Sequence, residues 1–187
     1  MINSSFHPFV PLVELTRGPL VESIHFGAVA VVDARGRLYA HYGDPQVWAN
    51  LRSSAKPFQV LSMIEDGGPE AFGLSERELA IACASHSGTE DHVSVLRSMQ
   101  AKLEVSEANL LCGTHYPLHD ASARAMRERG EKPTPNRHNC SGKHAGMLAL
   151  ASYHGWPTAG DPRTPHRGPA RIRVAASRWT GTPQTAA

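Results

Sequence analysis

Residues 52–57 read Arg-Ser-Ser-Ala-Lys-Pro and directly precede a stretch, residues 58–65, whose apolar residues have helical spacing. Residues three apart share one face of a helix, so we expect the Lys56 amine to lie beside the Ser53 hydroxyl. A serine needs a positioned base at neutral pH, and a lysine serves when burial or a nearby cation leaves its amine partly neutral. The spacing therefore indicates a serine nucleophile with a lysine base.

Ser53 is predicted to lie at or near the start of this helix. Pro57 fits within the first turn, where its missing N–H costs little. At a helix start, free backbone N–H groups and the helix dipole can stabilise a developing oxyanion. Ser54 is a rival nucleophile, but two residues from Lys56 it points to another part of the helix surface. The non-catalytic alternative is that Ser53 is only a helix N-cap and that Lys56 is only a solvated lysine.

Two further polar runs accompany the first. Residues 83–88 read Cys-Ala-Ser-His-Ser-Gly, and residues 138–144 read His-Asn-Cys-Ser-Gly-Lys-His. Two roles are open for Ser85. It borders an active-site pocket, where it passes a proton to the leaving group or forms the acyl bond itself, or it only ends the preceding helix. The Cys140 thiol and the flanking imidazoles suit zinc, although the spacing is not a standard one and a lysine ligand must first lose a proton.

These runs resemble the bacterial L-asparaginase II family that includes the inducible rhizobial enzyme. The similarity is carried by residues 52–59, by Ala-Ser-His-Ser-Gly-Thr-Glu-Asp-His from Ala84 to His92, and by Asn-Cys-Ser-Gly-Lys-His-Ala-Gly-Met from Asn139 to Met147. Three motifs of this length in one order are far more specific than a single Ser-x-x-Lys. The resemblance extends over residues 10–158.

The resemblance implies a fold similar to that of serine β-lactamases and glutaminases, with two Ser-Lys pairs and a zinc position beside them. Ser53 and Lys56 match the first pair, and Ser85 matches the serine of the second. Cys140 and Lys143 match two of the metal ligands.

The resemblance also implies hydrolysis of the side-chain amide of L-asparagine to L-aspartate and ammonia. A serine attacks the carboxamide carbon, backbone N–H groups stabilise the oxyanion, and water then breaks the acyl-enzyme. Arg52, His86 and Asn139 are the expected substrate-binding residues. Family enzymes tend to be dimers, so the resemblance implies a homodimer.

The end of the chain departs from the family pattern. Residues 160–187 lack Leu, Lys, Glu, Phe and Tyr and are rich in Arg and Pro, a composition that buries little surface. We expect residues 1–158 to form the N-terminal part of an asparaginase-II-like domain and residues 159–187 to be a disordered or out-of-frame tail. The second lysine and a further cysteine ligand have no counterpart, which leaves the zinc site incomplete.

Two alternative functions remain open at this point. The chain is an inactive asparaginase fragment if half of the active site is missing. It is a β-lactamase-like or glutaminase-like serine hydrolase if the Ser-Lys device serves another substrate, although the Lys-Thr-Gly run typical of β-lactamases is not present.

The resemblance implies a small-molecule partner, L-asparagine, and composition bears on the other classes of partner. The formal net charge is only +2, so nucleic-acid binding is not indicated. No stretch approaches the roughly 20 apolar residues of a membrane span, and the N-terminus lacks a signal sequence, which predicts a cytoplasmic protein that binds no membrane. Three cysteines imply no disulfide framework.

The elements expected along the chain are typical of the α+β class. Residues 26–32 and 38–42 predict a β-hairpin, and the sheet that it begins is expected to be incomplete, with an exposed apolar face. Helices are predicted after the Ser75 capping box and after Thr89, and over residues 120–129 and 145–154.

Overall fold

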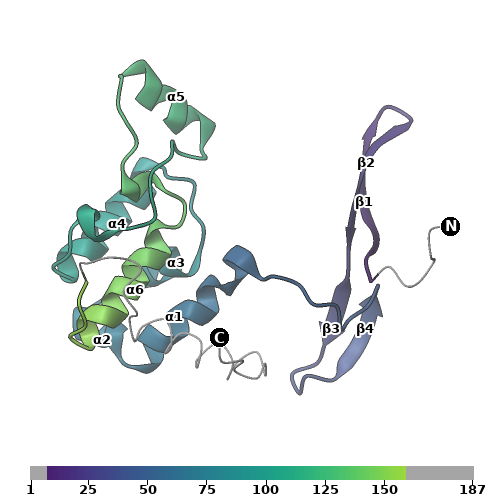
Figure 1. The fold of residues 1–187 in the computed structure, drawn as a ribbon, viewed down its shortest axis with the longest axis horizontal. Coiled ribbons are helices and arrows are strands. Elements are labelled where there is room, and N and C mark those ends of the chain that lie inside the picture. Colours follow the sequence, from purple (N-terminus) through teal and green to yellow (C-terminus); the bar gives the residue numbers. More distant parts are fainter. Residues whose placement is uncertain (1–7, 159–187) are drawn as a thin grey trace. The chain divides into compact units, whose positions relative to one another are not determined.

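The structure is a computed structural model that describes residues 8–158 (Figure 1). The chain divides into two compact units, residues 1–50 and 51–187. The described residues form two β-hairpins in the first unit and six α-helices in the second, which confirms the α+β class.

The hairpin predicted from residues 26–42 is present, with a shorter first strand. It pairs β3 (Val29–Val32) with β4 (Leu38–Tyr42) in antiparallel register. The Asp33 carboxylate organises the turn by accepting the backbone N–H groups of Arg35 and Arg37. The prediction placed the start of this strand too early, since residues 26 and 27 end the preceding strand.

A second hairpin, β1 (Val10–Arg17) with β2 (Leu20–Gly27), was not predicted. Its strands are joined by a two-residue loop in which Gly18 has a φ of +59°. Glycine at the first central position is a recognised signal for a tight hairpin turn, so the sequence did contain a cue. The cue was obscured because Pro11 lies inside the first strand and the apolar residues do not alternate regularly.

Both hairpins carry exposed apolar side chains, as expected for the second of them. Tyr39 is 85% exposed, Phe26 61% and Leu20 71%. Exposed apolar side chains of this size are what a sheet presents when its faces and edges have no cover within the described unit.

The second unit is helical (Figure 1). Its α-helices are α1 (Lys56–Glu65), α2 (Gly68–Phe72), α3 (Glu76–Cys83), α4 (Glu90–Lys102), α5 (Asp120–Glu128) and α6 (Ser141–Tyr153). Helix α6 packs against α1 and α3, and α3 also packs against α4. The core between these helices contains Val60, Met63, Ala82, Leu96, Met99, Ala145, Ala149 and Leu150. No helix of the described residues is long and apolar enough to cross a membrane.

Local signals predicted the helix starts well. Ser75 and Glu78 form the expected capping box at α3, and Thr89 caps α4. Helix α6 begins at Ser141, four residues before the predicted start at residue 145. The earlier start depends on tertiary packing, because a Cβ on Gly142 would lie 2.1 Å from the Ile81 carbonyl oxygen and only glycine allows this approach to α3.

Candidate active site

The Lys56 amine and the Ser85 hydroxyl are in direct contact, with 2.6 Å between Nζ and Oγ. A second hydrogen bond joins Lys56 Nζ to the Ala84 carbonyl oxygen at 3.3 Å. Lys56 is 3% exposed and Ser85 is exposed, so the amine reaches from the interior to a serine at the surface. This arrangement suits a base that serves a hydroxyl accessible to a ligand.

Lys56 and Ser53 are joined by a backbone hydrogen bond rather than by the expected contact between their side chains. Ser53 lies in a 3₁₀ turn, Arg52–Ala55, which precedes α1, and its carbonyl oxygen accepts the Lys56 backbone N–H. Lys56 shares the buried face of α1 with Val60 and Met63, so its side chain enters the interior, whereas Ser53 is exposed. In the part of the chain that the structure describes, the amine's hydrogen bonds go to residues 84 and 85.

Arg52, an expected substrate-binding residue, is exposed at the start of this turn. Its φ is +48°, in the left-handed region that non-glycine residues rarely adopt. Backbone strain of this kind clusters at binding and catalytic sites, where the surrounding structure maintains it.

His86 fixes the shape of the loop that carries Ser85. Its Nδ1 accepts the Gly88 backbone N–H at 3.1 Å, so the ring proton is on Nε2, which donates to Ser141 Oγ at 2.8 Å. Ser141 in turn donates to the Asn136 carbonyl oxygen. Although a serine and a histidine are in contact, this tautomer cannot act as a base toward Ser141.

The environment of His86 keeps the ring neutral. Burial lowers its pKa to about 4, and the charges of His92 and Lys56 act in the same direction. Since both ring nitrogens are used inside the protein, the structure favours a role in shaping the site over direct contact with a substrate.

Asn139 connects the Ser85 loop to the start of α6. Its carbonyl oxygen accepts the His86 backbone N–H at 3.2 Å, and its own N–H donates to His115 Nε2 at 3.1 Å. The other nitrogen of His115, Nδ1, lies 2.6 Å from the Tyr116 carbonyl oxygen and therefore carries the ring proton. Binding of substrate by His86 and Asn139 stays a prediction.

Cys140 and Lys143, the expected metal ligands, lie at the start of α6. Cys140 is the N-cap residue and has a free thiol, and Lys143 follows one turn later. Burial lowers the pKa of Lys143, a nearby Cys140 thiolate opposes this, and the Lys56 charge lowers it further. The net shift favours the neutral amine that a metal requires.

The donor set for a metal is not complete within the described residues. His144 uses Nδ1 to donate to the Cys140 carbonyl oxygen, which leaves Nε2 able to accept. However, no group of three or more His, Cys, Asp or Glu residues in the described part of the chain could hold a metal ion. A thiol and an amine alone do not make the four-coordinate site that zinc prefers.

A cavity of about 280 Å³ adjoins Ser85 between α3 and α4. Ala84, Ser85, His86 and His92 contribute to its lining. This volume is near the lower end for small-molecule pockets, which agrees with a small ligand.

Sequence reasoning missed three residues that shape the site, namely His115, Arg137 and Ser141. Arg137 is 7% exposed although arginine is rarely buried. Ser141 lies inside the third polar run and Arg137 directly precedes it, whereas His115 lies outside all three runs. The partners of these residues lie in other segments of the chain, and no local spacing indicates such contacts.

The chain belongs to the L-asparaginase II family, whose model matches residues 13–187. Membership implies an asparaginase-type amidohydrolase. No curated protein matches the chain. The matched region includes residues 159–187, which lie outside the described residues, so the expectation of a disordered or out-of-frame tail stays a prediction.

Proposed function

We propose that this chain hydrolyses the side-chain amide of L-asparagine by means of a Ser-Lys device built around Lys56. Family membership supports the reaction class. The observation that carries the proposal is the 2.6 Å contact between the buried Lys56 amine and the exposed Ser85 hydroxyl. The cavity of about 280 Å³ beside Ser85 suits a substrate of amino-acid size.

In the proposed mechanism Ser53 is the nucleophile, and its exposed side chain must turn toward the Lys56 amine, which contacts Ser85 in the described structure. Once unprotonated, Lys56 Nζ takes the Ser53 hydroxyl proton while Ser53 Oγ forms a bond to the carboxamide carbon. Ser85, hydrogen-bonded to Lys56, then passes that proton to the departing nitrogen, and the C–N bond breaks to release ammonia. Water adds to the acyl-enzyme, returns the proton to Ser53 Oγ and leaves L-aspartate.

Ser85 is the rival nucleophile, because its hydroxyl is the one in contact with the Lys56 amine. In that case Lys56 takes the Ser85 proton directly and returns it to ammonia. Mass spectrometry of protein quenched during turnover separates the two, since the aspartyl group remains on a peptide containing either residue 53 or residue 85.

Ammonia release from L-asparagine tests the proposal. We expect Ser85→Ala and Lys56→Gln to lower kcat at least about 100-fold, the usual loss when a general base or proton donor is removed. Ser94→Ala, on an exposed position of α4, serves as the matched serine control and retains activity. Wild-type ammonia release no greater than that of the Lys56→Gln variant would contradict the proposal and favour the inactive fragment.

Substrate preference and the rival hydrolase are tested with the same protein. Parallel assays with L-glutamine measure the preference for the shorter amide. A fluorescent penicillin that forms a stable covalent adduct in place of asparagine turnover would favour the β-lactamase-like alternative.

Zinc at Cys140 and Lys143 and a homodimer are further parts of the proposal. Cys140 and Lys143 need at least one additional donor to complete a zinc site. Since Cys140 would supply the thiolate, zinc content measured by elemental analysis should be lower in Cys140→Ser than in wild type. Sedimentation velocity of the purified chain measures its oligomeric state, and a monomer at micromolar concentration would exclude a stable dimer.

A further inference from the structure

Arg137 is a buried cation that joins the loop carrying Ser85 to the segment leading into α6. We propose that Arg137 is a positioning residue, whose guanidinium holds the loop at residues 85–88 so that the Ser85 hydroxyl stays at the Lys56 amine. The expected effect of Arg137 on catalysis rests on the proposed function, whereas its effect on the loop at residues 85–88 does not.

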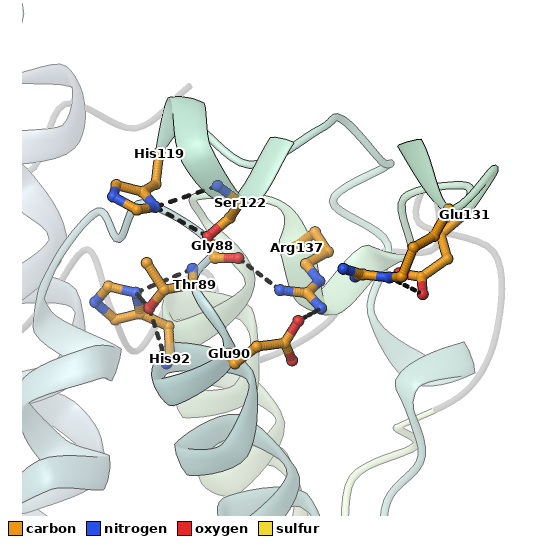
Figure 2. Close-up of polar contacts among 9 residues, drawn as sticks. Gly88, Thr89, Glu90, His92, His119, Ser122, Glu131 and Arg137 are labelled. Carbon is orange, nitrogen blue, oxygen red and sulfur yellow. Dashed lines mark hydrogen bonds and ion pairs between the residues drawn. The ribbon is translucent and has the colours of Figure 1, made fainter. Parts of the chain in front are cut away.

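The two arms of the guanidinium contact two different groups (Figure 2). Arg137 Nη1 donates to the Gly88 carbonyl oxygen at 2.9 Å, and Nη2 donates to Glu90 Oε1. Gly88 ends the loop and Glu90 begins α4, so one side chain fixes both the loop and the helix that follows it. Arg137 itself ends the 3₁₀ turn Pro135–Arg137.

The backbones of Gly88 and Arg137 also lie unusually close together. Gly88 has a φ of +72°, and a Cβ at this position would lie 2.7 Å from the Arg137 carbonyl oxygen. Any larger residue would push the loop away from Arg137. The sequence thus supplies both the cation and the glycine that permits the approach.

Other contacts hold the opposite side of the same loop. The His119 backbone N–H donates to the Ser87 carbonyl oxygen at 3.1 Å, and Lys56 holds Ala84 and Ser85. His119 also caps α5 through Ser122, as Figure 2 shows. The loop is therefore short and attached at both ends, with His86 bound between them to Asn139 and Ser141, and we expect a displacement at Gly88 to shift Ser85.

A lysine at position 137 would not reproduce this arrangement. Guanidinium presents several donors in a rigid planar fork, whereas an ammonium is a single point charge on a flexible stem. Gly88 O is a buried acceptor and Glu90 an exposed carboxylate, and we expect one ammonium to hold the two less firmly than the two arms of the guanidinium do. Displacement of a catalytic group by about 1 Å typically costs about 100-fold in rate.

Arg129 offers a matched control. It makes a bidentate ion pair with Glu131, at 2.6 and 2.8 Å, and both side chains are about half exposed. Figure 2 labels Glu131, the acidic member of this pair, on the same side of the view as Arg137. Because neither residue contacts the Ser85 loop in the described structure, Arg129→Lys should change a surface ion pair and leave the loop unaffected.

The test compares Arg137→Lys with Arg129→Lys and wild type in the full chain. Hydrogen exchange is measured by mass spectrometry on a peptide covering residues 85–89 and on one covering α6. We expect faster exchange at residues 85–89 in Arg137→Lys, with α6 unchanged, and a kcat about 100-fold lower with KM within about threefold. Glu90→Gln, which alters only the exposed partner, should produce a smaller change in the same direction and provides a variant that folds.

Unchanged exchange at residues 85–89 in both Arg137→Lys and Glu90→Gln would overturn the inference. Equal acceleration of exchange in α6 and at residues 85–89 would also overturn it, because Arg137 would then only stabilise the helical unit as a whole. If wild-type protein releases no ammonia, the proposed function fails, and the exchange measurement still decides whether Arg137 holds the loop.

Discussion

Replacement of Gly142 by alanine has two opposing effects on the free energy of unfolding, a gain in helix propensity and a steric clash. Gly142 is the second residue of α6, and alanine is favoured over glycine inside a helix by about 1 kcal/mol. The new Cβ would lie 2.1 Å from the Ile81 carbonyl oxygen, whereas ordinary contacts begin at 3.4 Å. Helices α6 and α3 would therefore have to separate by about 1 Å in a close-packed region.

The steric effect should prevail. Overpacking of a core typically costs about 1–3 kcal/mol, and the upper end applies because the obstacle is backbone that cannot rotate away. After the gain in propensity is subtracted, we expect Gly142→Ala to lower the free energy of unfolding by about 2 kcal/mol.

Gly146→Ala is the matched control on the same helix. Its Cβ would meet Ala82 Cβ at 3.2 Å and Val60 Cγ2 at 3.6 Å, which are side-chain contacts that small shifts relieve. The gain in propensity then offsets most of the crowding, and we expect a change of less than about 1 kcal/mol.

Thermal unfolding followed by circular dichroism compares the two variants. A loss of about 2 kcal/mol lowers Tm by about 10 °C in a unit of roughly 100 residues. If Gly142→Ala unfolds at the same temperature as Gly146→Ala or above it, the close approach of α6 to α3 is not as described.

Three further predictions concern pH and the Ser85 loop. Burial raises the pKa of Glu78, but hydrogen bonds from Lys102, Ser75 and Ser98 outweigh this and lower the pKa from 4.5 to about 2. The ionised Glu78 therefore contributes about 3 kcal/mol of stability above pH 4.5, and this contribution is lost as the pH falls toward 2. Urea unfolding at pH 7 and pH 3 should show a larger loss of stability in wild type than in Glu78→Gln. For His86, whose pKa is lowered from 6.5 to about 4, the contribution to stability is complete above pH 6.5 and declines toward pH 4. His86→Gln should therefore make the dependence of stability on pH less steep in this range. Gly88→Ala, which brings a Cβ to 2.7 Å from the Arg137 carbonyl oxygen, should reduce ammonia release, and activity equal to wild type would contradict the close approach.

Much of the helical architecture could be predicted because its signals are local. The capping boxes at Ser75 and Thr89 lie within four residues of the groups that they satisfy, and the structure confirms both. The start of α6 could not be predicted, because residues 141 and 142 are poor helix formers and become helical through packing against α3. The first hairpin was missed because the proline in β1 conceals the strand pattern.

The site residues named from the sequence stay predictions, and the contacts among them could be predicted only in part. The spacing of Ser53 and Lys56 indicated a Ser-Lys device, but the Lys56 amine contacts Ser85, which is 29 positions away. Periodicity assigns a residue to a helix face and says nothing about which distant loop covers that face. Arg137 and Gly88 are 49 positions apart, so their contact could not be predicted for the same reason.

A double-mutant cycle on Lys56 and Ser85 tests the central claim most directly. The kcat/KM for L-asparagine is measured for wild type, Lys56→Gln, Ser85→Ala and the double variant. If the two side chains act as one proton-transfer unit, the double variant should lose no more than about tenfold beyond the more damaging single variant. Losses that multiply, or a single variant with wild-type kcat/KM, would contradict the account.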